Sequence, residues 1–175
     1  LIWQLVWRAP DLKPGTAILA NDFPNQNYLA GNALSTEIDW IYSKTQPPNK
    51  KGLDYLFVFL NSPTRDSIDE MAPGKKIDYD FRGYQFHGNT DNTFLVGLKS
   101  NGCLRVLDNQ LTPIFTVFDL YSKQVQDGAA ISNLNPIVTD AEDKKPPQYL
   151  FGSEPAHTWC FYFEKAELAL QVGDY

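Results

Sequence analysis

Two histidines and two cysteines are the first candidates for covalent or acid–base chemistry in this chain. They are His87, His157, Cys103 and Cys160. A thiolate beside a histidine base would make a covalent nucleophile, but it must be partly exposed. Cys160 stands between two aromatic residues, and neither cysteine lies in a glycine-rich turn. We therefore expect either two buried free thiols or, in an oxidising compartment, one long-range disulfide.

Two polar loops carry the residues considered for ligand binding. Asp22 and Asn25 follow the first predicted strand, and His87, Asn89 and Asp91 lie in a later turn cluster. Ligands of open α/β sheets bind beyond the carboxyl ends of strands, so the first loop could hold a sugar hydroxyl or a metal. Both loops also suit solvated turns whose side chains bond the backbone. We expect a ligand or acceptor surface near these loops.

Cofactor and metal motifs are not found. The segment Ala30–Ala33 is not a glycine-rich phosphate-binding loop, and the cysteine spacing fits no zinc site. Asp39, Asp78 and Asp80 could serve a glycosidase, which needs two converging carboxyl groups. Nothing in their spacing makes two of them converge, and Asp78 and Asp80 share one face of a strand. The sequence therefore predicts no cofactor, no metal and no identifiable catalytic residue.

Composition limits the classes of protein. The 175 residues include 15 Lys and Arg against 21 Asp and Glu, which gives a net charge of −6. This acidic balance argues against nucleic-acid binding, which needs a basic face. Hydrophobic residues make up 43% and aromatic residues 14%, enough for a globular core. No apolar run reaches the about 18 residues that a membrane span needs.

A βαβ unit is predicted to position the first loop. Thr16–Ala20 is a short apolar strand, and Ala30–Tyr42 places apolar residues at helical spacing. Leu53–Leu60 is almost continuously apolar, as expected of a strand in the middle of a parallel sheet.

An antiparallel meander is predicted next. Lys76–Phe86 alternates apolar and polar residues, as in one half-exposed strand, and the turn cluster His87–Asn92 follows. Thr93–Leu98 and Cys103–Leu107 are two more strands, joined by an Asn-Gly hairpin signal. We therefore expect an α/β fold bordering on α+β, with the βαβ unit and the meander in one mixed sheet flanked by helices.

The rest of the chain is predicted to hold two helices separated by irregular structure. Pro113–Gly128 is the first helix, and Asn133–Ser153 is irregular. Ala156–Val172 is the C-terminal helix, with Pro155 in its first turn and Gly173 as its cap.

The first ten residues form a short apolar helix with two interpretations. Trp3 and Trp7 lie one helical turn apart. Either the helix docks on the core, or it emerges from a membrane with its tryptophans at the interface. Arg8 would tie this helix to the sheet. We expect residues 1–175 to be one soluble domain, with a juxtamembrane-like helix over 1–10 and the C-terminal helix over 155–175.

The C-terminal helix is similar to the first helix of a tetratricopeptide-type hairpin. Tyr162, Ala166 and Ala169 precede Gly173, and the two alanines would let a second helix approach closely. A simple amphipathic helix is the alternative. The resemblance implies that a helical-repeat region follows.

Several stretches resemble the extracytoplasmic domain of bacterial multi-pass membrane proteins related to the dolichol-phosphate-mannose mannosyltransferase and GT-C glycosyltransferase superfamily. They are Trp7–Pro10 with Leu12–Thr16, Gly102–Leu107, and Glu154–Cys160 with Tyr162–Ala166. In that superfamily the catalytic acidic residue lies in a loop of the membrane part. The resemblance therefore assigns no catalytic residue to this chain.

The function expected from these observations is non-catalytic. The resemblance implies a domain on the extracytoplasmic side of the cell membrane, which recognises an acceptor or docks a partner. Its partners would be its own transmembrane region and a carbohydrate or lipid-linked sugar. The alternatives are a stand-alone hydrolase using Asp22 or His87, and a protein-interaction module.

Overall fold

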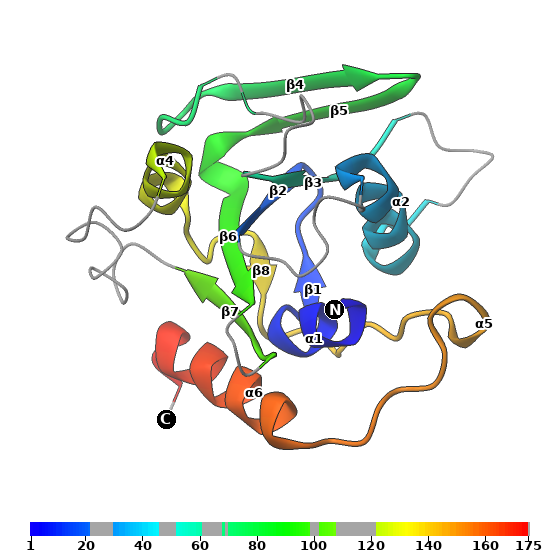
Figure 1. Cartoon of the computed structure of the whole chain (residues 1–175). Coiled ribbons are helices and arrows are strands. Elements are labelled where there is room, and N and C mark those ends of the chain that lie inside the picture. Colours follow the sequence, from blue (N-terminus) through cyan, green and yellow to red (C-terminus); the bar gives the residue numbers. More distant parts are fainter. Residues whose placement is uncertain are drawn as a thin grey trace.

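The computed structural model describes residues 1–21, 30–45, 52–60, 68, 70–98, 102–107 and 122–174 (Figure 1). Asp22 and Asn25 therefore lie outside the described residues. Helices and strands are mixed, which confirms the α/β class. The elements are α1 (Ile2–Arg8), β1 (Asp11–Leu12), β2 (Thr16–Asn21), α2 (Gly31–Tyr42), β3 (Tyr55–Phe59), β4 (Lys76–Phe81), β5 (Tyr84–Asn89), the 3-10 helix η1 (Thr90–Asn92), β6 (Thr93–Leu98), β7 (Leu104–Leu107), α4 (Lys123–Ile131), β8 (Ile137–Val138), α5 (Gln148–Phe151) and α6 (Trp159–Val172).

The central sheet is four-stranded and mixed, in the order β3-β2-β6-β7. β2 runs parallel to both β3 and β6, and β7 runs antiparallel to β6. The βαβ unit is confirmed, because α2 lies between the parallel strands β2 and β3. The burial of β3 on both faces is as expected, but β3 is not in the middle of the described sheet, since β2 and β6 are its inner strands.

Both faces of the sheet are covered, which explains why an outer strand is so apolar. Alternate residues of β3 enter two separate clusters: Tyr55 and Phe57 pack with α2, while Leu56 and Val58 pack with α4. Figure 1 shows α2 and α4 on opposite sides of the sheet. A continuous apolar run therefore indicates that both faces of a strand are covered, but it does not indicate whether the strand is central or at the edge of its sheet.

The meander differs from its prediction. Lys76–Phe86 is not one strand, because the chain reverses at Arg82 and Gly83 and β4 pairs with β5 antiparallel. This hairpin forms a two-stranded sheet of its own, and Figure 1 shows it at the far end from α6. Its inward residues Ile77 and Phe86 pack into the cluster that α4 covers. The single mixed sheet thus holds β6 and β7 of the meander, but not the hairpin.

The helices of the second half begin later than predicted. α4 begins at Lys123, and residues 113–121 of the predicted helix lie outside the described part of the chain. α6 begins at Trp159, so Pro155 is not in its first turn. Its cap is confirmed, because Gly173 takes a left-handed conformation with φ 74°. The predicted irregular stretch contains only the short elements β8 and α5.

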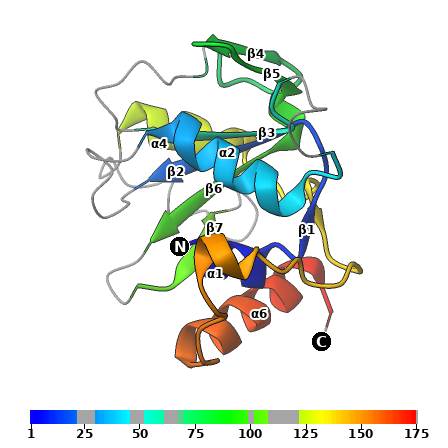
Figure 2. The ribbon, with the colours of Figure 1, turned by 90° about the vertical axis from the view of Figure 1, so that its right-hand side faces the viewer.

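The N-terminal helix docks on the core, as one of its two interpretations expected. Leu5 and Val6 are buried in the cluster on the α2 side of the sheet. Trp7 is also buried, and α1 packs against α6 and β7. Figure 2 shows α1 between the sheet and α6. Among the described residues, no helix combines the length and apolarity of a membrane span.

Candidate functional site

His87 lies in a strand and not in the predicted turn. It belongs to β5, opposite Asp78 of β4, and its Nδ1 is 2.7 Å from Asp78 Oδ1. The two side chains are 76% and 68% exposed. A pair on such an open surface lacks the walls that would hold a substrate and exclude water.

Asn89 and Asp91 support the turn that leads into β6. The Asn89 side chain accepts a hydrogen bond of 2.8 Å from the Asp91 backbone N–H. Asp91 Oδ1 in turn accepts one of 2.8 Å from the Gly74 backbone N–H. Asp91 Oδ2 has no hydrogen-bond partner among the described residues, so one carboxylate oxygen is available to a ligand.

A groove of about 410 Å³ opens beside Asp91. The end of α4, the following residues 132–135, and Gln171 of α6 line it. Its polar lining residues include Asp91, Asn133 and Asn135, and its lining holds no lysine or arginine. The Gln171 amide is not open to a ligand, because its Nε2 donates to the Val106 carbonyl and its Oε1 is buried. Its apolar lining includes Pro73 and Leu134. Such a groove suits a neutral ligand with several hydroxyl groups, because carboxylate and amide oxygens accept from hydroxyls.

Asn21, the last described residue before the first predicted loop, does not line this groove. In the parallel register of β2 and β6, Ala17 pairs with Thr93 and Asn21 pairs with Gly97. Asp91 therefore precedes the amino end of β6, whereas Asn21 lies at the carboxyl end of β2.

A disulfide joins β7 to α6. Cys103 and Cys160 are bonded, with their Cα atoms 5.0 Å apart and a sequence separation of 57. Of the two interpretations of the cysteines, the structure has the long-range disulfide and not the free thiols. A catalytic thiol on either residue is thereby excluded in this state.

Charged side chains are buried where α1, β7 and α6 meet. Arg8 and Glu164 are both 0% exposed, and Arg8 Nε is 3.9 Å from Glu167 Oε2. Arg105 of β7 forms an ion pair with the same Glu167. The contact with Glu167 lets Arg8 join α1 to α6, whereas the sequence predicted that Arg8 joins this helix to the sheet.

Glu164 has the most perturbed carboxyl group of this junction. Its Oε1 accepts a 2.9 Å hydrogen bond from the Leu104 backbone N–H. Burial raises the pKa of Glu164 to about 7, while the Leu104 hydrogen bond and the charge of Arg8 act against the shift. Sequence reasoning missed this residue. The helical pattern gave no clear signal, because the same side of α6 also buries the carboxylate of Glu167.

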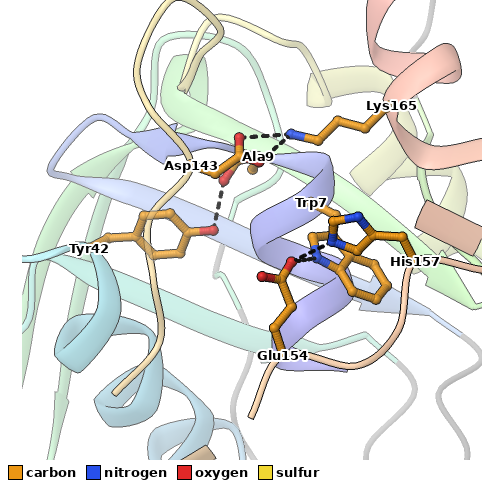
Figure 3. Close-up of polar contacts among 7 residues, drawn as sticks. All are labelled: Trp7, Ala9, Tyr42, Asp143, Glu154, His157 and Lys165. Carbon is orange, nitrogen blue, oxygen red and sulfur yellow. Dashed lines mark hydrogen bonds and ion pairs between the residues drawn. The ribbon is translucent and has the colours of Figure 1, made fainter. Parts of the chain in front are cut away.

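His157 belongs to a cluster that joins the segment before α6 to α1 (Figure 3). Its Nε2 is 2.8 Å from Glu154 Oε1, and the same oxygen accepts a 2.9 Å hydrogen bond from Trp7 Nε1. The imidazole stacks on Phe161 with 3.6 Å between ring centroids. Hydrogen bonds from His157 and Trp7 lower the pKa of Glu154. The cluster uses Glu154 as an acceptor for two donors, which is a structural role.

Two further contacts in Figure 3 join segments that are distant in the sequence. The Tyr42 hydroxyl donates a 2.8 Å hydrogen bond to the Ala9 carbonyl. Lys165 Nζ lies 2.7 Å from Asp143 Oδ1. The first contact joins α2 to the end of α1, and the second joins α6 to the loop before α5.

Metal ligands and relatives give no further assignment. In the part of the chain that the structure describes, no three His, Cys, Asp or Glu residues are grouped to hold a metal ion. No protein-family model, curated protein or solved structure matches the chain. The site must therefore be interpreted from its own geometry, and the groove beside Asp91 is the described site that contains a predicted ligand-binding residue.

Proposed function

We propose that this chain is a non-catalytic recognition domain on the extracytoplasmic side of a bacterial multi-pass membrane protein. In this proposal, the groove beside Asp91 binds the carbohydrate part of an acceptor. The parent would be a glycosyltransferase-like enzyme whose chemistry takes place in its membrane part. The observation that carries the recognition role is the gathering of hydrogen-bond acceptors in a groove of about 410 Å³.

The disulfide supports the location. Disulfides persist in oxidising compartments and are rare in the reducing cytoplasm. The bond between Cys103 and Cys160 holds α6 over a junction that contains buried charges, so its loss would expose that junction. A domain built in this way suits the outside of a cell.

The lining of the groove supports a carbohydrate over a phosphate. A phosphate group requires basic side chains or a set of backbone N–H donors. The lining has neither lysine nor arginine, and it carries the negative charge of Asp91. A neutral sugar avoids this repulsion, and its hydroxyls can donate to Asp91 Oδ2 and exchange hydrogen bonds with the Asn135 amide.

The absence of a catalytic role is supported by the way the titratable groups are used. His87 pairs with Asp78 on an open hairpin, and His157 shares the Glu154 carboxylate with the indole N–H of Trp7. Glu164 has a pKa near that of a general acid, but it is fully buried and has no path to a substrate.

Titration with neutral mono- and disaccharides, followed by backbone amide NMR, tests the recognition role. We expect chemical-shift changes at Asp91 and residues 133–135, and no such changes with inorganic phosphate. Asp91→Asn keeps an oxygen for the Gly74 N–H but removes the charge, and it should weaken binding about tenfold or more. Asp78→Asn, a matched change of another exposed carboxylate, should leave binding unchanged.

Two results would overturn this assignment. Amide signals around the groove that stay unmoved by every sugar up to its solubility limit would reject the ligand class. Equal weakening by Asp78→Asn and Asp91→Asn would reject the groove. Release of free sugar from a glycoside, abolished by His87→Ala, would favour the hydrolase instead.

A further inference from the structure

The outward face of α6 is apolar and uncovered within the described structure. Trp159, Tyr162 and Leu170 are 69%, 62% and 55% exposed, and Ala166 lies between them on the same stripe. Their spacing places them on one side of the helix, opposite the buried Glu164 and Leu168. We call these four residues, Trp159, Tyr162, Ala166 and Leu170, the α6 stripe.

The α6 stripe lies at one extremity of the molecule. Figures 1 and 2 differ by a rotation about the vertical, and α6 forms the lower rim in both. No other described element lies below it in either view, so a broad flat surface can reach the whole helix. A small ligand would find no hollow here, because a single helix is convex.

The chemistry of the stripe is that of an interface between water and hydrocarbon. Tryptophan and tyrosine have apolar rings with one polar group, and they concentrate where one end is apolar and the other is wet. The indole N–H of Trp159 and the hydroxyl of Tyr162 have no protein hydrogen-bond partner among the described residues. Both polar groups are therefore available to lipid headgroups and water.

The area of the stripe is too small for a second copy of the chain. Aromatic side chains contribute about 150–250 Å² each, so the exposed fractions leave roughly 400 Å² of apolar surface. Two copies joined through it would bury roughly 800 Å² in total, below the about 1,200 Å² of stable protein interfaces. A bilayer surface sets no such minimum when the protein is already held at the membrane.

We propose that the α6 stripe lies on the membrane surface, with Trp159 and Tyr162 in the headgroup region of the bilayer. The stripe would then fix how the domain sits above the membrane. This inference uses the location given in the proposed function, but it is independent of the Asp91 groove.

The net charge of the domain determines which lipid headgroups favour its binding. The chain has a net charge of −6, so anionic lipids repel it at a distance. Contact through the stripe must therefore come from apolar and aromatic partitioning. Zwitterionic phosphatidylcholine should bind the stripe better than a mixture that contains phosphatidylglycerol, and added salt should reduce the difference between them.

Vesicles with an N-terminally anchored chain provide the test. The 175-residue chain carries a His tag at its N-terminus and is held on phosphatidylcholine vesicles by nickel-chelating lipids. Phosphatidylcholine brominated on the acyl chains quenches tryptophans that reach the bilayer. The measurement uses a Trp3→Phe, Trp40→Phe background, because both of these tryptophans are partly exposed, whereas Trp7 is buried in the protein. In this background we expect brominated lipid to quench the emission, and Trp159→Phe to remove the quenching.

A second measurement uses untagged chain and co-sedimentation with the same lipids. Trp159→Ser with Tyr162→Ser should weaken partitioning at least about tenfold. Tyr84→Ser is the matched control, because this exposed aromatic lies on the hairpin far from α6 (Figure 1). Thermal unfolding checks that each variant keeps its fold, as expected for exposed positions.

Each other outcome rejects the proposal. Trp159 emission that is unaffected by brominated lipid on anchored vesicles removes the bilayer as occupant. So does partitioning that survives the double substitution or is lost equally in Tyr84→Ser. A concentration-dependent dimer that the double substitution abolishes would assign the stripe to a second copy. These results leave the sugar titration untouched, so the two proposals fail separately.

Discussion

At the residue scale, Glu164 couples the stability of the domain to pH. Its carboxyl pKa is raised from 4.5 to about 7 in the folded chain, mainly by burial. A raised pKa favours the protonated, folded form, so this stabilisation is complete below pH 4.5 and is lost as pH rises through 7. Ionisation of Glu164 should therefore lower the free energy of unfolding by about 3 kcal/mol as the pH rises from 4.5 to 7.

The groups around Glu164 define the control for this prediction. Arg8 and the Leu1 amino group place positive charge near the Glu164 carboxyl group, and Glu167 places negative charge near it. The Leu104 N–H donates a hydrogen bond to the same carboxyl group. Partial burial lowers the pKa of the Leu1 amine, and this shift changes stability with pH in the opposite direction. Urea unfolding of the wild type and of Glu164→Gln isolates the carboxyl, because the amide imitates its neutral form. Identical pH profiles would refute the assignment.

A second residue-scale prediction concerns Arg82 in the hairpin turn. Arg82 and Gly83 have φ values of 52° and 85°, both in the left-handed region. Asparagine tolerates that conformation better than arginine, and Asn-Gly is the preferred pair for such turns. Arg82→Asn also loses the cation–π contact with Phe81, 5.0 Å from the ring centroid. We expect the free energy of unfolding, measured by thermal unfolding, to rise by about 0.5 kcal/mol. A lower midpoint would show that the cation–π contact dominates.

At the element scale, the disulfide fixes α6 to the sheet. The bond closes a loop of 57 residues, which constrains the unfolded chain by about 4 kcal/mol in the chain-entropy treatment. Reduction should therefore lower the urea midpoint substantially. The double variant Cys103→Ser with Cys160→Ser should unfold at the midpoint of the reduced wild type and should not respond to reductant. A reduced chain as stable as the oxidised one would mean that α6 docks without the bond.

The elements differ in how far the sequence alone could predict them. β2 and β3 follow from short apolar runs, because every residue of both strands is buried, and α2 follows from the helical spacing of its apolar residues. The β4–β5 hairpin was missed because its turn is Arg82-Gly83, without the usual asparagine. In the groove, Asp91 was predictable from its polar turn. Gln171 was not, since only the packing of α6 brings it there.

At the scale of the whole molecule, the proposed orientation requires the entire domain to lie on one side of the membrane. Tyr149 is 78% exposed on α5, so a cysteine placed there can be reached without unfolding the domain. In the full-length gene product, Tyr149→Cys should react with a membrane-impermeant maleimide in intact spheroplasts. The unmodified chain should not react, because its two cysteines are bonded to each other. Labelling that requires permeabilised cells would place the domain in the cytoplasm and remove the oxidising environment on which the disulfide depends.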